Sequence, residues 1–145
     1  MRSVEDLVEQ ASSWAGISVH PHRFGGREFR FGNGEIGHVH PNGVVDIPFP
    51  RALRDALVEE RLAEQHHWVP NSGWISFRVR HEDELGNALW LLRLSYVRYA
   101  LKTGAEQDFL EREAQQLGLS TRFKSLLENF ICRPANKTAR QPASR

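Results

Sequence analysis

The chain is poor in cysteine, in net charge and in long apolar runs, and each shortage excludes a class of protein. One cysteine, Cys132, among 145 residues rules out an internal disulfide and is compatible with a reducing compartment. A formal net charge of +1 provides no overall field to attract nucleic acid or anionic lipid. The sequence has neither an apolar run of about 18 residues nor a charged-then-apolar leader. We therefore expect a cytoplasmic protein that has no membrane partner, and the charge does not favour nucleic acid as a partner.

What is present is the composition of an ordinary globular domain. Hydrophobic residues make up 40% of the chain and charged residues 26%, as is typical of folded proteins. A chain of this length can bury roughly two thirds of its unfolded surface around one core. We expect residues 1–131 to form a single α+β domain, and the polar, basic residues 132–145 to form a flexible tail.

Two hydrophobic periods alternate along the chain and predict the order of its elements. A period of 3.6 residues predicts helices at residues 3–16, 50–64, 82–102, 105–118 and 120–130. A period of two, interrupted by glycine-rich turns, predicts strands at residues 17–23, 27–31, 35–40, 44–49, 65–69 and 74–80. The expected α+β architecture is an antiparallel sheet of about six strands with helices packed on one face, an N-terminal helix and a C-terminal helical segment.

The loop "HPNG" decides which sheet face the two neighbouring histidines occupy. A two-residue Asn-Gly turn would require a backbone N–H from Pro41, and proline has none. Proline instead favours the second position of a type I turn, here followed by a glycine bulge. This three-residue loop places His40 opposite Val44 and His38 opposite Asp46, so the histidines and the aspartate share a face. The opposite face, which we expect to join the core, carries Val39, Val45, Ile47 and Phe49.

Alternation in the strand "WISFRVR" agrees with this division into a polar and a core face. Trp74 and Arg78 fall on the polar face, where the indole is a candidate to stack on a planar ligand and the guanidinium to bind an anionic oxygen. We expect this face, with His38, His40 and Asp46, to form the floor of a pocket for a small molecule. Four further histidines are predicted to be surface residues: His20, His22, His66 and His81.

Histidines at positions i and i+2 of a strand point the same way, with Cα atoms about 7 Å apart, and this spacing permits two chemistries. One is a shared divalent metal, with His67 or Asp46 as a third ligand beside His38 and His40. The other is metal-free: Asp46 raises the pKa of His38 and fixes its tautomer, and His38 serves as a general base. The sequence favours the base, with His40, Asp46 and His67 as the other catalytic residues, and leaves a metal site formed by His38, His40 and His67 open.

The histidine motif also carries a family resemblance. Residues 25–100 resemble the small bacterial luciferase-domain proteins and the C-terminal part of fungal luciferase. The resemblance rests on a Glu-Ile-x-His-x-His segment, a Gln-x-His segment, and a Trp strand before a helix ending in Ser and Tyr. The matching residues are Glu35, His38, His40, Gln65, His67, Trp74, Ser95 and Tyr99. Strand alternation nevertheless places Glu35 on the face opposite His38, in a structural role, unless the strand begins with a bulge.

The resemblance implies an oxygenase activity. Fungal luciferase oxygenates a hydroxylated pyrone, a hispidin derivative, with molecular oxygen. By that resemblance the chain is a cofactor-independent or metal-dependent oxygenase of a small, planar, oxygen-bearing molecule, with molecular oxygen as co-substrate. A non-catalytic ligand-binding or protein-interaction domain that uses the same face is the alternative. A weaker resemblance to the MmcQ/YjbR group implies DNA binding, against which the near-neutral charge argues.

Overall fold

The computed structural model describes residues 2–66 and 72–132 of the chain. The chain forms two compact units, which divide between Tyr99 and Ala100. The prediction of one domain over residues 1–131 stays a prediction. Of the predicted flexible tail, residues 133–145 lie outside the described residues.

The first unit is built on a six-stranded sheet in the order β1-β2-β3-β4-β6-β5, in which every pair of neighbours is antiparallel. Its strands are β1 (Ile17–His22), β2 (Gly26–Phe31), β3 (Gly34–Val39), β4 (Val44–Pro48), β5 (Glu64–Gln65) and β6 (Trp74–Arg78). The predicted antiparallel sheet of about six strands is confirmed. The predicted strand over residues 65–69 enters the described structure only at its first residues, because residues 67–71 lie outside it.

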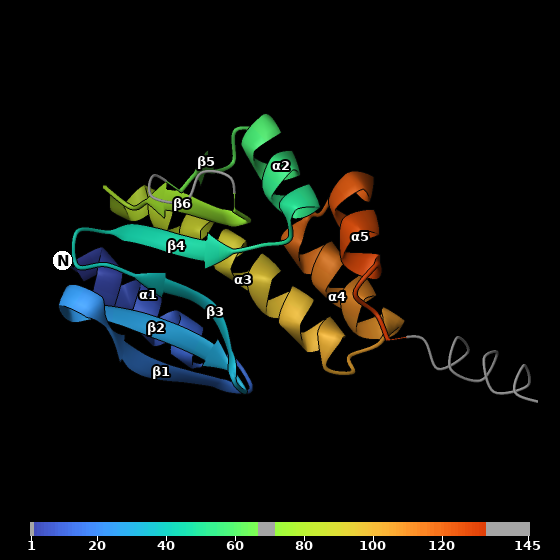
Figure 1. Cartoon of the computed structure of the whole chain (residues 1–145), viewed down its shortest axis with the longest axis horizontal. Helices are drawn as coiled ribbons and strands as arrows, with labels where there is room; N and C mark the ends of the chain where they lie inside the picture. Colours follow the sequence, from blue (N-terminus) through green and yellow to red (C-terminus); the bar gives the residue numbers. More distant parts are fainter. Residues whose placement is uncertain (1, 67–71, 133–145) are drawn as a thin grey trace, which may run out of the picture. The chain divides into compact units, whose positions relative to one another are not determined.

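Two helices of the first unit, its first and its last, cover one face of this sheet, as predicted (Figure 1). The helical elements are α1 (Arg2–Ser12), η1 (Arg23–Gly25), α2 (Arg51–Glu59), η2 (Glu82–Glu84) and α3 (Leu85–Lys102). The Tyr96 hydroxyl of α3 donates to the carbonyl oxygen of Ala15 at 2.6 Å and ties α3 to the turn that follows α1. The core that they enclose contains fully buried side chains from helices and strands: Leu7, Phe29, Ile36, Val45, Ile47, Ile75, Leu91, Leu92 and Leu94.

The hairpin between β3 and β4 closes as its proline predicts. The backbone N–H of His40 donates to the Val44 carbonyl at 2.8 Å, and the N–H of Gly43 donates back to His40 at 2.9 Å. Gly43 has a φ of 93°, which fits the left-handed position of the bulge. His38 therefore pairs with Asp46 across the ladder, and the predicted register is confirmed.

A bulge in β3 changes the face of Glu35, and here strand alternation gave the wrong answer. In the β2–β3 ladder Phe29 pairs with Gly37 but Arg30 pairs with Glu35, so Ile36 is an extra residue. One extra residue shifts the alternation by one place, and Glu35 joins the face of His38. Packing holds this point of the strand close to α3, because a Cβ added at Gly37 would lie 2.8 Å from Cδ1 of Leu92.

The second unit is helical and confirms the predicted C-terminal helical segment. After the last residues of α3 come α4 (Gln107–Leu117) and α5 (Thr121–Glu128). Gly118, with φ 64°, ends α4, and the Ser120 hydroxyl accepts from the backbone N–H of Phe123 at the start of α5. Across the whole described part of the chain, no helix combines the length and the apolar character that crossing a membrane requires.

Candidate functional site

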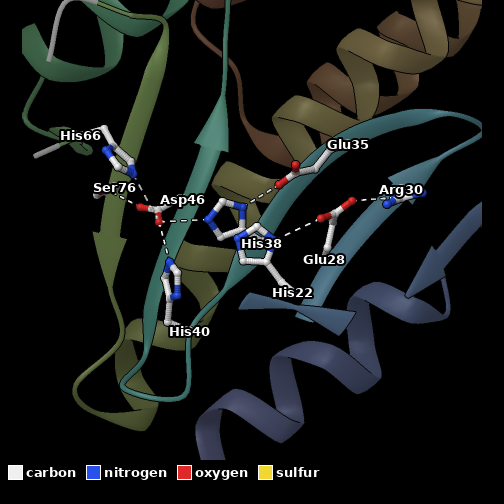
Figure 2. Close-up of polar contacts among 9 residues, drawn as sticks. All are labelled: His22, Glu28, Arg30, Glu35, His38, His40, Asp46, His66 and Ser76. Carbon is white, nitrogen blue, oxygen red and sulfur yellow. Dashed lines mark hydrogen bonds and ion pairs between the residues drawn. The ribbon is translucent and has the colours of Figure 1, made fainter. Parts of the chain in front are cut away.

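The buried carboxylate of Asp46 is the centre of a cluster of imidazoles on the polar face of the sheet (Figure 2). Three histidine Nε2 atoms approach its Oδ2 atom, those of His40 at 2.8 Å, His38 at 3.1 Å and His66 at 3.5 Å. Its other oxygen, Oδ1, accepts from the Ser76 hydroxyl at 2.6 Å. Strands β3, β4 and β6, with the residues that follow β3 and β5, thus bring one acid and its partners together.

His38 lies between two carboxylates, so neither of its ring nitrogens is free. Its Nδ1 atom is 2.6 Å from Oε2 of Glu35, which the bulge brings to this face, and its Nε2 atom faces Asp46. The side chain is only 10% exposed. A histidine with an acid at each nitrogen has no lone pair to offer a substrate, which argues against the predicted role of His38 as the general base.

His22 of β1 stacks on His38 from the next-but-one strand. The two ring centroids are 3.8 Å apart with an interplanar angle of 16°. Gly26 of β2, the strand between them, pairs with His22 across the β1–β2 ladder. A Cβ at that position would approach the Val39 carbonyl oxygen to 2.9 Å and the Cβ of His22 to 3.4 Å. The backbone of β3 and the side chain of His22 therefore leave no room for a side chain at this position.

A second carboxylate–imidazole pair lies beside the first cluster. Nδ1 of His22 is 3.0 Å from Oε1 of Glu28, whose other oxygen accepts from Nε of Arg30 at 2.6 Å. In the described part of the chain, Nε2 of His22 has no hydrogen-bond partner. Burial opposes the charge of Glu28, but the hydrogen bonds from His22 and Arg30 lower its pKa. Glu28 is therefore an anion that fixes the His22 proton on Nδ1.

Burial and hydrogen bonding act in opposite directions on the two central groups. Burial would lower the pKa of His38, but its bonds to Asp46 and Glu35 outweigh that effect and raise the pKa to about 9. Burial would raise the pKa of Asp46, but bonds from His38, Ser76 and His40 hold it well below its usual range. Without a bound cation, Asp46 is therefore ionised and His38 protonated at neutral pH.

The cluster lines an open cavity of about 640 Å³, to which His22, His38, His40, Asp46, His66 and Ser76 all contribute. Phe24 of η1 also lines it, with 90% of its surface exposed. Its backbone has φ 58° and ψ 38°, a left-handed conformation that costs a residue with a Cβ about 1 kcal/mol or more. A strained backbone therefore holds an exposed aromatic ring at the cavity.

Part of this chain is similar to a known family. Residues 33–95 match the family model described as Luciferase domain. The predicted resemblance to that family is confirmed over this segment, whereas the resemblances to fungal luciferase and to the MmcQ/YjbR group stay predictions. No curated protein and no solved structure matches the chain. The luciferase-domain segment contains the whole Asp46 cluster, while His22 and Phe24 precede it.

The structure brings together most, but not all, of the residues that the sequence nominated. His38, His40 and Asp46 share one site, and the ring of Trp74 lies 5.4 Å from that of His38. Arg78 is exposed and lines a second cavity of about 680 Å³, which shares Val44 and Ser76 with the first. His67 lies outside the described residues. The ligand-binding roles of Trp74 and Arg78 stay predictions.

Sequence reasoning missed three members of the site. His22 and His66 were predicted to be surface residues, but their side chains are only 20% and 15% exposed and contact the cluster. Adjacent histidines at positions 66 and 67 signalled that this strand supplies an imidazole, without telling which one. Glu35 was signalled by the luciferase-domain pattern and hidden by strand alternation, because a bulge is not visible in the spacing of side chains.

Proposed function

We propose that the protein binds a small planar enol or phenol in the histidine cavity, removes its hydroxyl proton, and promotes its oxygenation by molecular oxygen. The observation that carries this proposal is the Glu28–His22 pair, whose free Nε2 atom belongs to a residue that lines the cavity. Enols and phenols react with oxygen far more readily once ionised, because the anion gives up an electron more easily. A base at the cavity is therefore the group that such a reaction needs.

The base role belongs to His22 rather than His38 on geometric grounds. Both nitrogens of His38 face acids, whereas Glu28 occupies only Nδ1 of His22. The acid keeps the proton on Nδ1 and leaves the Nε2 lone pair to accept the substrate's proton. His40 also has one nitrogen engaged, but it shares Asp46 with two other imidazoles.

The planar shape of the ligand is supported by the aromatic surfaces around the cavity. Phe24 exposes its ring at the cavity despite the costs of strain and of apolar exposure. A flat ligand would stack on it and cover it. The match of residues 33–95 to the luciferase-domain family adds weight to oxygen chemistry, through the resemblance to an enzyme that oxygenates a hydroxylated pyrone.

Oxygen consumption tests the proposal, with a hydroxylated pyrone of the hispidin type as probe. We expect saturable uptake of oxygen by the wild-type protein, and a fall of roughly 100-fold or more in the saturated rate of His22→Ala. His20→Ala is the matched control, because His20 is on the same strand and, among the residues described, forms a side-chain hydrogen bond only with Ser18. Added imidazole should restore part of the lost rate.

Two outcomes would count against the proposal. Equal rates in His22→Ala and His20→Ala would remove His22 from the reaction. Quenching of tryptophan fluorescence measures binding of the pyrone. Binding without oxygen uptake would indicate a non-catalytic binding domain instead of an oxygenase.

A further inference from the structure

Three imidazoles converge on one carboxylate oxygen, which is more donors than that oxygen can serve. An ionised carboxylate oxygen offers about two lone-pair sites, yet Nε2 atoms of His38, His40 and His66 all lie within 3.5 Å of Oδ2 of Asp46. Serving all three by hydrogen bonds would require each imidazole to carry its proton on Nε2. A cation placed among these atoms would accept one lone pair from each of the three Nε2 atoms and one from Oδ2, and none of the Nε2 atoms would need a proton.

The distances from the carboxylate oxygen to the three nitrogens match the edges of a coordination shell. Transition metals bind imidazole nitrogen and carboxylate oxygen at about 2.0–2.2 Å. Two ligand atoms of one metal are then roughly 2.9 Å apart at right angles and roughly 3.4 Å apart at a tetrahedral angle. The N–O distances of 2.8, 3.1 and 3.5 Å span this range. The donor atoms of His38, His40 and Asp46 also lie within 4.8 Å of one another.

The outer partners are those that metal ligands commonly have. A ligating imidazole usually donates its second N–H to a carboxylate, and a ligating carboxylate usually accepts a further hydrogen bond. Glu35 occupies Nδ1 of His38, and Ser76 occupies Oδ1 of Asp46. Neither carboxylate pairs with a lysine or an arginine among the residues described. Glu35 and Asp46 therefore lie at the two nitrogens of His38 without a lysine or arginine side chain among the described residues to neutralise either of them.

We propose that Nε2 of His38, Nε2 of His40 and Oδ2 of Asp46 bind a divalent first-row transition metal, with Nε2 of His66 as a fourth ligand. Mixed nitrogen and oxygen donors select this class over calcium and magnesium, which prefer oxygen alone. Two histidines and a carboxylate with open positions are also the ligand set of non-haem iron oxygenases. The inference replaces His67, which the sequence nominated, by its neighbour His66.

The metal deepens the proposed function and rests on it for its role in the reaction. The metal-binding residues and the base are different: His22 stacks on the metal-binding His38 but does not itself bind the metal. A metal at this position would hold the ligand's hydroxyl oxygen in the cavity that His22 lines and lower its pKa. His22 would take the released proton at Nε2.

Titration with Co²⁺ alone tests the metal site without any substrate. Protein purified without a histidine tag is treated with a chelator and titrated with Co²⁺, whose visible absorbance reports nitrogen ligands, and Zn²⁺ is then added as a competitor. We expect one equivalent to bind. Affinity should fall by more than roughly 100-fold in His40→Ala and in Asp46→Asn, and His20→Ala should bind as the wild type does.

Each remaining outcome separates the two proposals. Circular dichroism identifies a variant that has lost its fold, and His40, with a side chain 28% exposed, is the substitution that the fold should tolerate better. Equal Co²⁺ affinity in folded His40→Ala and wild-type protein would overturn the metal site. Undiminished oxygen uptake by chelator-treated protein would overturn the metal's role and leave the function of His22 standing. Stoichiometric metal binding without oxygen uptake would overturn the proposed function and leave the metal site standing.

Discussion

Asp46 and Ile47 are neighbours on β4, yet their side chains lie on opposite faces of the sheet in different environments. Ile47 is fully buried among aliphatic side chains, where contacts are numerous and non-directional. Asp46 is 3% exposed, and its carboxylate forms hydrogen bonds with imidazoles and a hydroxyl, each at a defined atom. The residues of the core face therefore need only to fill the available volume, whereas those of the polar face must place particular atoms at hydrogen-bonding distance.

The difference indicates which face serves stability and which serves function. Burial of apolar area stabilises the fold whatever the detailed contacts. Burial of acids and imidazoles opposes folding unless every group has a partner, and apolar residues of similar volume often stabilise as well or better. A cluster of this kind is therefore better explained by binding than by stability. The predictions below test that division.

The largest effect on the fold is expected on the core face. Ile47→Ala should reduce the free energy of unfolding by about 2–5 kcal/mol, because it removes three carbons from a fully buried site. Urea denaturation measures this loss, and Ile47→Val, expected to cost about 0.5–1.5 kcal/mol, is the graded control. The fraction that remains folded should still bind one Co²⁺. Loss of Co²⁺ binding in folded Ile47→Ala would mean that the two faces are not independent.

On the polar face, pH should change the stability of the metal-free protein. The pKa of His38 rises on folding from 6.5 to about 9, so its contribution is complete below the unfolded value and is lost as the pH rises through about 9. The limit is about 3 kcal/mol, at about 1.4 kcal/mol per pKa unit. Asp46, with a lowered pKa, contributes above its unfolded value and loses that contribution in acid.

The urea midpoints of chelator-treated protein near pH 6 and near pH 10 measure the contribution of His38 to the free energy of unfolding. In the control variant His38→Ala, this pH-dependent contribution should vanish. A midpoint that rises between these pH values would contradict the ion pairs.

A smaller effect is expected from the outer partner of His38. Glu35→Gln keeps the size of the side chain but removes its charge, so it should weaken Co²⁺ binding by about 10–100-fold. The exposed Glu9→Gln substitution on α1 is the matched control and should leave the affinity unchanged. Equal affinities in the two variants would show that Glu35 does not orient the imidazole.

The smallest effect is expected from Arg78. Its side chain is exposed and lines the neighbouring cavity, so Arg78→Ala should change the free energy of unfolding by less than about 0.5 kcal/mol. Its Co²⁺ affinity should equal that of the wild type. A higher KM for an anionic pyrone, with an unchanged value for a neutral one, would restore the predicted ligand-binding role of this arginine.

Local chemistry made much of the hairpin predictable. Because Pro41 has no N–H, only one loop length satisfies the backbone, and that length sets the register of His38 with Asp46. Local reasoning failed earlier in the same strand, where the bulge at Ile36 changes the face of Glu35. A bulge there depends on how Gly37 packs against Leu92, a residue more than fifty positions away in the chain, and no local pattern records that contact.

By itself, then, the sequence determined the sheet, the hairpin register and the face shared by His38, His40 and Asp46, because periodicity and proline act over a few neighbouring residues. Only the tertiary structure decided that His22, His66 and Glu35 join them. His22 reaches the site across an intervening strand, and Glu35 reaches it because of a bulge. His66 contacts Asp46, although the sequence nominated its neighbour. Such arrangements depend on contacts between distant segments, which spacing along the chain does not encode.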